Sequence, residues 1–237
     1  MQILAVASQK GGSGKTTLAG HVAVAAERAG AGPVALIDTD PQGSLADWWN
    51  ERRMQTPVFA HTYIARIRSD IEAMRSSGIK LLVFDTPPAI TTTIESVIEI
   101  ADLVLVPARP SPHDLRAAGA TVAIVERCRK QLVFVINAAT KGARITGEAA
   151  IALSQHGTVA PVTIHQRTDF AASMIDGRTV MELDSNSQSA SEITQLWQYL
   201  ATRLNRVQHR PLLHQRHALA PKRRVFGQRG VKQTSAI

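Results

Sequence analysis

The stretch SQKGGSGKTTLAG, Ser8 to Gly20, follows the short apolar run ILAVA (residues 3–7) at the start of the chain. Its ending, Gly-Lys-Thr, is typical of a phosphate loop, although the pattern G-x-x-x-x-G-K-[ST] has glycine where this chain has Gln9. A second lysine, Lys10, stands five residues before Lys15. Backbone N–H groups can converge on an anion here, beside the N-terminus of a following helix, because three positions are glycine: Gly11, Gly12 and Gly14. The stretch predicts a phosphate site and leaves the extra lysine to be explained.

Two acidic motifs follow other apolar runs and complete a nucleotide site. Asp38 and Asp40 end the run in VALIDTDPQGS, and Asp85 ends the run in LLVFDTPP. An aspartate at a strand end often serves as a turn residue or a helix cap, so each motif alone is a weak signal. Together with Lys15, placed for the β- and γ-phosphates, and Thr16, placed for Mg²⁺, they predict a site for a nucleoside triphosphate and Mg²⁺, in which Asp85 holds a metal-bound water.

Short aliphatic runs alternate with helix-like stretches along most of the chain. The expected strands are residues 3–7, 34–37, 81–84, 103–106, 132–136 and 159–164. The expected helices include residues 16–29, 114–128 and 189–207, the last with the possible N-terminal capping signature SASE. This alternation predicts an α/β fold, a doubly wound and mostly parallel sheet with helices on both faces. In such a sheet, ligands bind at the carboxyl ends of the strands.

Composition excludes several other classes of protein. The single cysteine, Cys128, rules out a disulfide framework or a cysteine-ligated cluster within one chain. The first residues lack a signal peptide and no window approaches about 18 continuous apolar residues, so we expect a cytoplasmic protein. Because the phosphate loop lies so near residue 1, we also expect no separate DNA-reading domain ahead of it.

The net charge of +8 is concentrated at the end of the chain. Residues 201–237 hold nine of the 27 Lys and Arg residues and none of the 19 acids, which leaves 18 basic against 19 acidic residues in the first 200. We therefore expect a near-neutral globular body followed by a basic tail over residues 207–237. The composition of the tail suits nucleic acid or an anionic membrane, and also a solvated, disordered appendage.

The three motifs KGGSGKTT, DTDPQGS and VFDTPP together resemble the deviant Walker A, A′ and B motifs of the ParA/MinD family of ATPases. The stretches PARPSPHDLRAAG and TIHQRTDFAASMIDGRTVMEL are similar to those of small ParA-type (ParF-like) plasmid partition ATPases. The similarity runs from about residue 1 to residue 206, and the basic tail falls outside it.

The resemblance assigns a role to the extra lysine. In this family the lysine that corresponds to Lys10 reaches across a nucleotide-sandwich dimer to the partner's ATP. Asp40 would orient or activate the attacking water, Asp38 would support the Mg²⁺ shell, and Thr17 would contact the α-phosphate. Ser13 belongs to the nucleotide-binding loop, and Asn137 is a candidate for adenine contact by its position after a strand.

The resemblance also implies partners. The expected function is a DNA-segregation ATPase that dimerises on ATP, coats nucleoid DNA non-specifically and hydrolyses ATP, slowly by itself, when a ParB-like centromere-binding protein stimulates it. A MinD-like membrane-positioning ATPase is the alternative, ranked lower because Pro211 and Pro221 interrupt the tail. The candidate DNA contacts are basic residues of the later loops and the tail: Lys141, Arg144, Arg167, Arg178, Arg216, Lys222, Arg223 and Arg224.

Overall fold

The computed structural model describes residues 1–88 and 92–218, with side chains as far as Val207. Its centre is one sheet of seven strands in the order β3-β2-β4-β1-β5-β6-β7, and every neighbouring pair is parallel. The strands are β1 (Gln2–Val6), β2 (Val34–Asp38), β3 (Val58–Phe59), β4 (Leu81–Asp85), β5 (Leu103–Ala108), β6 (Gln131–Ala139) and β7 (Thr158–His165). All six predicted strands and the parallel α/β class are confirmed. The two-residue edge strand β3 was not predicted.

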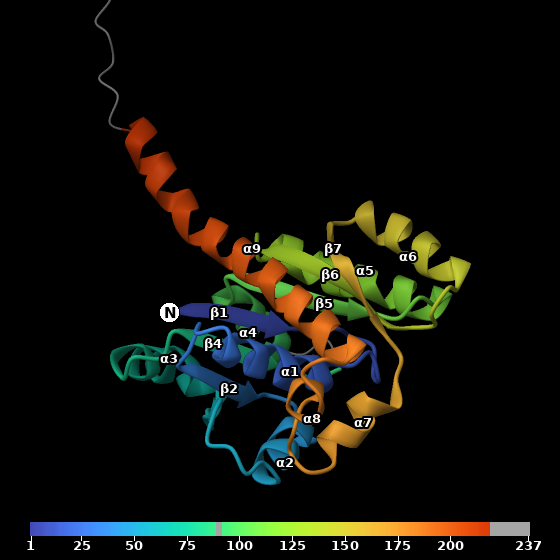
Figure 1. The fold of residues 1–237 in the computed structure, drawn as a ribbon. Helices are drawn as coiled ribbons and strands as arrows, with labels where there is room; N and C mark the ends of the chain where they lie inside the picture. The colour runs from blue at the N-terminus through green and yellow to red at the C-terminus, as the bar shows by residue number, and fades with distance from the viewer. Residues whose placement is uncertain (89–91, 219–237) are drawn as a thin grey trace, which may run out of the picture.

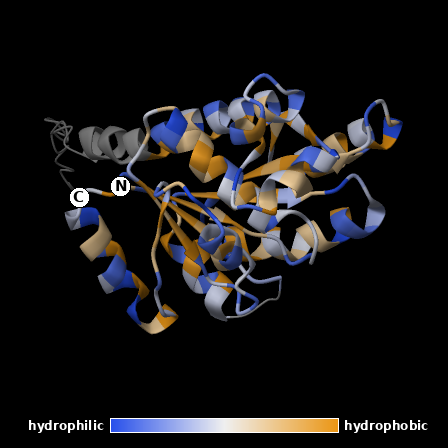
Figure 2. Ribbon diagram, turned by 60° about the horizontal axis from the view of Figure 1, so that its bottom comes forward, coloured by the Kyte–Doolittle hydropathy of each residue, from blue (hydrophilic) through white to orange (hydrophobic). Residues whose placement is uncertain are grey.

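Helices cover both faces of the sheet, because successive strand residues point to opposite sides. In β1, Leu4 and Val6 face one core cluster and Ile3 and Ala5 face the other. On the first face lie α1 (Lys15–Arg28), α2 (Ser44–Asn50), α7 (Thr168–Met174), α8 (Val180–Leu183) and α9 (Gln188–Ala218). On the second lie the short η1 (Ile64–Arg66), α3 (Ile67–Ser76), α4 (Thr92–Ile100), α5 (Pro112–Arg127) and α6 (Arg144–Ser154). Figure 1 shows α1 and α9 in front of the strands, and Figure 2 shows the apolar strands enclosed between the layers.

The last helix differs from its prediction at both ends. The hydroxyl of Ser187, rather than Ser189 of the SASE signature, accepts the backbone N–H of Ala190 at 3.1 Å. The helix also continues past Pro211 to Ala218, beyond the expected end at residue 207. A proline in a helix removes one hydrogen bond and strains one turn, which costs about 3 kcal/mol but does not always end the helix. The division expected between residues 206 and 207 therefore falls inside α9.

Helix α9 runs from the carboxyl ends of the strands toward their amino ends. Near its start Glu192 accepts the backbone N–H of His165, at the carboxyl end of β7, and further along Asn205 accepts the side-chain amide of Gln2, at the amino end of β1. In Figure 1 the end of α9 extends beyond the strands, away from their carboxyl ends. No described helix combines the length and apolar composition that crossing a bilayer requires. The predicted tail residues Lys222, Arg223 and Arg224 lie outside the described residues.

Candidate functional site

The predicted phosphate loop joins β1 to α1 at the carboxyl edge of the sheet. Gly14 precedes the helix with φ 95°, a left-handed conformation that favours glycine. A Cβ at this position would lie 2.2 Å from Nδ2 of Asn137, which donates to the carbonyl of Ser13 at 2.7 Å. Gly11 and Gly12 are exposed at the surface of the loop. Asn137 is thus buried beneath the loop and supports its shape, while its contact with adenine remains a prediction.

Lys15, Thr16 and Asp85 come together directly after the loop. The Thr16 hydroxyl donates to Oδ2 of Asp85 at 2.5 Å, and Asp85 is only 1% exposed. Burial raises the pKa of the Asp85 carboxyl to about 7, against the opposing effects of the Thr16 hydrogen bond and of Lys15. Burial also lowers the pKa of the Lys15 ammonium, which Asp85 and Asp40 partly offset. Both charges are held where water stabilises them poorly.

The residues around Asp85 fit a magnesium ion. Oδ1 of Asp85 is buried and accepts no hydrogen bond from the described residues, although a buried carboxylate oxygen is costly without a partner. Mg²⁺ takes one or two carboxylates, a hydroxyl, phosphate oxygens and several waters. No group of three or more His, Cys, Asp or Glu side chains suited to a metal ion occurs among the described residues. The donor set of Thr16 and Asp85 therefore suits a metal that arrives with phosphates.

Asp38 and Asp40 differ in what their carboxylates already hold. Oδ1 of Asp38 accepts the N–H of Asp40 at 2.9 Å, and Oδ2 accepts the N–H groups of Leu45 and Ala46 at the start of α2, at 2.9 and 3.2 Å. Burial nevertheless raises the pKa of Asp38. In Asp40, Oδ1 accepts the N–H of Gln42 at 3.0 Å, and Oδ2 has no hydrogen-bond partner in the described part of the chain. Asp38 positions α2, and Asp40 is the more available of the two.

A cavity of about 980 Å³ opens in front of the loop. Lys15, Thr16, Thr17 and Asp40, four of the predicted nucleotide or metal residues, line it, and so do Gly11, Gly12 and Gly14. The lining residues that were not predicted to belong to the site include Trp48, Arg109 and Phe170. The sequence offered little signal for Arg109, which lies in a proline-rich loop. Lys10 is exposed on the loop and is not among the residues that line this cavity.

One wall of the cavity is held by the start of α9. Arg167, which precedes α7, lines the cavity and donates both Nη atoms to Glu192 at 2.8 and 2.7 Å. The hydrogen bonds to Glu192 raise the pKa of Arg167 further. Glu192 also accepts a hydrogen bond from Nδ1 of His165 at 2.8 Å. The charge of Arg167, predicted to contact DNA, is therefore largely neutralised within the chain.

A buried cluster lies where the end of α2 meets α8. Arg52 is inserted between them, its side chain 3% exposed, and it pairs with Glu182 at 2.6 Å. It also donates to the carbonyl of Gly177 at 2.7 Å and lies 5.3 Å from the ring centre of Trp48. The Trp48 indole N–H donates to the carbonyl of Arg178 at 3.0 Å. We call this cluster of Arg52, Glu182, Trp48 and Gly177 the Arg52 clamp, and within it Trp48 packs against Arg52.

His21 connects the clamp to the helix that follows the phosphate loop. It is completely buried, with Nδ1 2.7 Å from the carbonyl of Thr17 and Nε2 accepting the N–H of Val180 at 3.2 Å. These contacts fit a neutral ring with the proton on Nδ1. Burial lowers the pKa of His21 to about 4. His21 thus joins α1 to α8 through uncharged hydrogen bonds.

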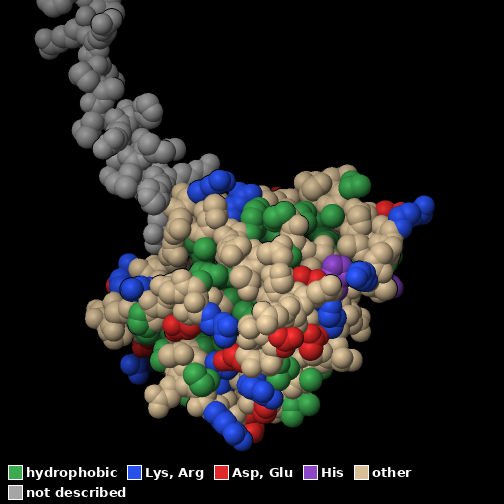
Figure 3. All heavy atoms as spheres, in the orientation of Figure 1, with side chains coloured by type: hydrophobic (Ala, Val, Ile, Leu, Met, Phe, Trp, Pro, Cys, Tyr) green, Lys and Arg blue, Asp and Glu red, His purple; other side chains and the backbone are tan. Residues whose placement is uncertain are grey.

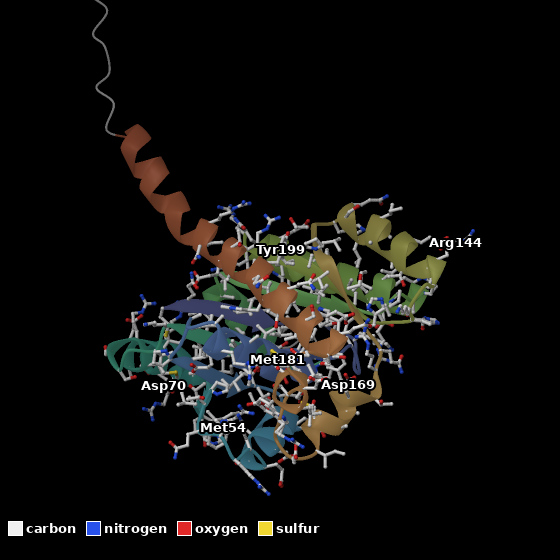
Figure 4. All side chains as sticks on the ribbon, in the orientation of Figure 1. Met54, Asp70, Arg144, Asp169, Met181 and Tyr199 are labelled. Carbon is white, nitrogen blue, oxygen red and sulfur yellow. The ribbon has the colours of Figure 1, made fainter. Side chains whose placement is uncertain are left out.

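The other predicted DNA contacts are spread over the surface. Arg144 projects from the start of α6 (Figure 4), its side chain is 92% exposed and it pairs with Glu148 at 3.1 Å, and Arg178 pairs with Asp176 at 2.8 Å. Lys141 is exposed just before α6. On the face drawn in Figure 3, basic and acidic side chains alternate rather than gather by sign. The side chain of Arg216 lies outside the described part, so the DNA contacts remain predictions.

Comparisons with known proteins agree with this geometry. A family described as the CobQ/CobB/MinD/ParA nucleotide binding domain matches residues 4–180. Maintenance of carboxysome distribution protein A of Halothiobacillus neapolitanus is 28% identical over 205 residues, which cover 81% of this chain and 93% of that protein. The structure of the cell division protein MinD of Aquifex aeolicus matches with a TM-score of 0.71 and 18% identity, covering 85% of this chain and 97% of MinD. A ParA family ATPase of Chlorobium tepidum matches with a TM-score of 0.67 and 19% identity, covering 84% and 99%.

Proposed function

Because the chain belongs to the CobQ/CobB/MinD/ParA family of nucleotide-binding proteins, we propose that it is a magnesium-dependent ATPase of the ParA type, which dimerises around ATP and partitions DNA. One observation carries the proposal: Lys15 and Thr16 line one cavity together with the loop glycines, and Thr16 donates to the incompletely hydrogen-bonded Asp85. Such a set of groups is costly in an empty protein and is stabilised by a bound triphosphate.

The residues in and beside the cavity have different roles in hydrolysis. Lys15 neutralises the β- and γ-phosphates, and the loop glycines present backbone N–H groups to them. Thr16 and Asp85 would hold Mg²⁺, which supplies positive charge across the two terminal phosphates. Asp38 keeps α2 and the adjacent Asp40 in place, and the free oxygen of Asp40 orients the attacking water. Thr17 faces the α-phosphate side of the site.

Lys10 completes the site of a second copy of the chain. Its exposed position, away from the lining of its own cavity, favours contact with the ATP of a partner protomer. A lysine supplied in this way makes dimerisation depend on ATP, since two triphosphates facing each other need additional positive charge.

The cargo follows from the charge distribution. The body carries a net charge near −1 over its first 200 residues, and the end of the chain is strongly basic. We propose that this basic segment, with Lys141 and Arg144 as auxiliary contacts, binds DNA without sequence preference. A ParB-like partner would stimulate hydrolysis and release the dimer from the nucleoid.

Two alternatives to DNA each have one observation in their favour. The likeness to the carboxysome distribution protein over 81% of the chain favours a protein assembly as the cargo.

A membrane surface, as for a MinD-like ATPase, is the other alternative. It is favoured because α9 continues past Pro211, the proline that was expected to interrupt a membrane-binding helix.

Hydrolysis is tested by replacing Asp40 with Asn. We expect Asp40→Asn to bind Mg·ATP as the wild type does and to lose turnover by about a hundredfold, because only the orientation of water is lost. Asp47→Asn is the matched control, since Asp47 lines the same cavity from α2 without a proposed role. ATP turnover, measured with and without DNA, separates the two, and similar losses in both variants would contradict the role of Asp40.

The DNA partner is tested by truncation after Ala218, which keeps α9 and removes five cations, Lys222, Arg223, Arg224, Arg229 and Lys232. If these contact phosphates, the slope of log K against log[salt] for non-specific duplex should change by about 4 to 5. ATP binding should not change. Identical slopes would contradict the DNA role of this segment, and binding that survives only on anionic liposomes would favour the membrane alternative.

A further inference from the structure

Arg109 lies beside the phosphate loop although it is far from it in the sequence. It follows β5, which pairs with β1, the strand that leads into the loop, and the N–H of Ala7 donates to the carbonyl of Leu105 at 2.9 Å. Pro107 and Pro110 restrict the backbone on either side of Arg109. The side chain is therefore presented to the loop from a stiff connection rather than from a freely moving one.

The guanidinium reaches the surface of the loop itself. Its Nη2 atom lies 3.9 Å from the position that a Cβ of Gly12 would occupy. Arg109 lines the same cavity as Lys15 and Asp40 and is exposed to solvent. No carboxylate pairs with it, and no acceptor takes its N–H groups, among residues 1–88 and 92–207.

Arg167 provides the comparison within the same cavity. Its guanidinium donates to both oxygens of Glu192, so its charge and donors are already used. The five donors of Arg109 are unused by the described residues, although both arginines line one cavity with three loop glycines. An arginine fork of this kind matches the oxygens of a phosphate group.

We propose that Arg109 contacts the terminal phosphate of the bound nucleotide, as a cation additional to Lys15 and Lys10. The inference rests on the proposed ATPase function and names a further residue of that site. In the proposed function Thr17 contacts the α-phosphate and Lys15 the β- and γ-phosphates, so Gly12, at the other end of the loop from Thr17, lies on the side of the terminal phosphate. Arg109 therefore favours a triphosphate over a diphosphate.

The test compares nucleotides that differ by that phosphate. The affinities of full-length protein for a non-hydrolysable ATP analogue and for ADP are measured with Mg²⁺ by titration calorimetry. Arg109→Gln should weaken analogue binding about tenfold, which corresponds to the loss of one charge-assisted contact, and change ADP binding less than about twofold. Arg109→Lys keeps the charge without the planar guanidinium, so its affinity for the analogue should lie between those of the wild type and Arg109→Gln.

Arg116→Gln on the exposed side of α5 is the control for the loss of one positive charge, because Arg116 is not part of the cavity lining. Unchanged analogue affinity in Arg109→Gln, or an equal loss for both nucleotides, would overturn the contact with the terminal phosphate and leave the ATPase proposal standing. A wild-type protein that binds neither nucleotide would overturn the ATPase function itself and the role of Arg109 with it.

Discussion

Two regions of the molecule, the Arg52 clamp and the phosphate loop, each bury a cation near a carboxylate. In the Arg52 clamp, Arg52 donates to both oxygens of Glu182, to the carbonyl of Gly177 and to that of Thr56. At the phosphate loop, Lys15 is 7% exposed and forms no ion pair of 4.0 Å or less with any described residue, and one oxygen of Asp85 is without a partner. Both regions hold a cation and a carboxylate, but the charged groups of the clamp are paired and hydrogen-bonded, and those of the phosphate loop are not.

This difference distinguishes a structural charge from a functional one. A buried ion pair whose hydrogen bonds are all made holds elements in a fixed geometry, here α2 against α8. A buried charge that is left incompletely paired costs stability, and proteins retain such groups mainly at sites where a ligand completes them. The comparison predicts opposite responses to mutation in the two regions.

The largest expected effect is on the stability of the clamp. Arg52→Ala should lower the free energy of unfolding by about 3–5 kcal/mol, because it leaves Glu182 buried without its cation. Nucleotide affinity of the molecules that remain folded should change little. Arg53→Ala, at the adjacent exposed position, is the matched control. Urea unfolding of both variants measures the difference, and equal small losses would mean that the clamp does not stabilise the fold.

The next effect separates the two lysines of the loop. Lys15→Ala should weaken ATP binding about a hundredfold, or roughly 3 kcal/mol, since two charge-assisted contacts are lost. The melting temperature of this variant should not fall, because the substitution removes an ammonium group whose charged form is destabilised by burial. Fluorescence titration and thermal unfolding of the nucleotide-free protein measure these two properties.

Lys10→Ala provides the contrast with Lys15→Ala. It should keep ATP binding by the monomer and lose the ATP-dependent dimer, which light scattering would detect. Equal loss of affinity in both variants would place Lys10 in its own protomer's site and remove the reason for a second lysine.

The smallest expected effect is at His21, where the two regions meet. The pKa of His21 is lowered to about 4 in the folded protein from 6.5, so between these values the unfolded state binds the proton and the folded state does not. Stability is therefore lost as the pH falls from 6.5 to 4, by about 2–3 kcal/mol at pH 4.5. His21→Gln, which cannot take up this proton, should lose less stability between pH 7 and 4.5. Parallel losses in denaturant unfolding would contradict the neutral ring inferred from its hydrogen bonds.

Local patterns in the sequence were sufficient to predict the phosphate loop, the strands and the acidic residues that end them. The glycines, Lys15 and Thr16 lie within a few residues of one another, and an apolar run followed by aspartate marks a strand end wherever it occurs. Since the carboxyl ends of parallel strands lie along one edge of the sheet, Asp38 and Asp85 could be placed beside the loop without coordinates.

Contacts between residues far apart in the chain were decided only by the tertiary structure. The pairing of Arg52 with Glu182 joins positions 130 residues apart, and Asn137 supports a loop 124 residues before it. The strand order places β5 beside β1 and so brings Arg109 to Gly12, while the packing of α9 against β7 brings Glu192 to Arg167. An arginine in a sequence has the same charge and donors in either case. Whether that charge is neutralised or available depends on which side chains the packed elements place within hydrogen-bonding distance, and short-range patterns do not determine that.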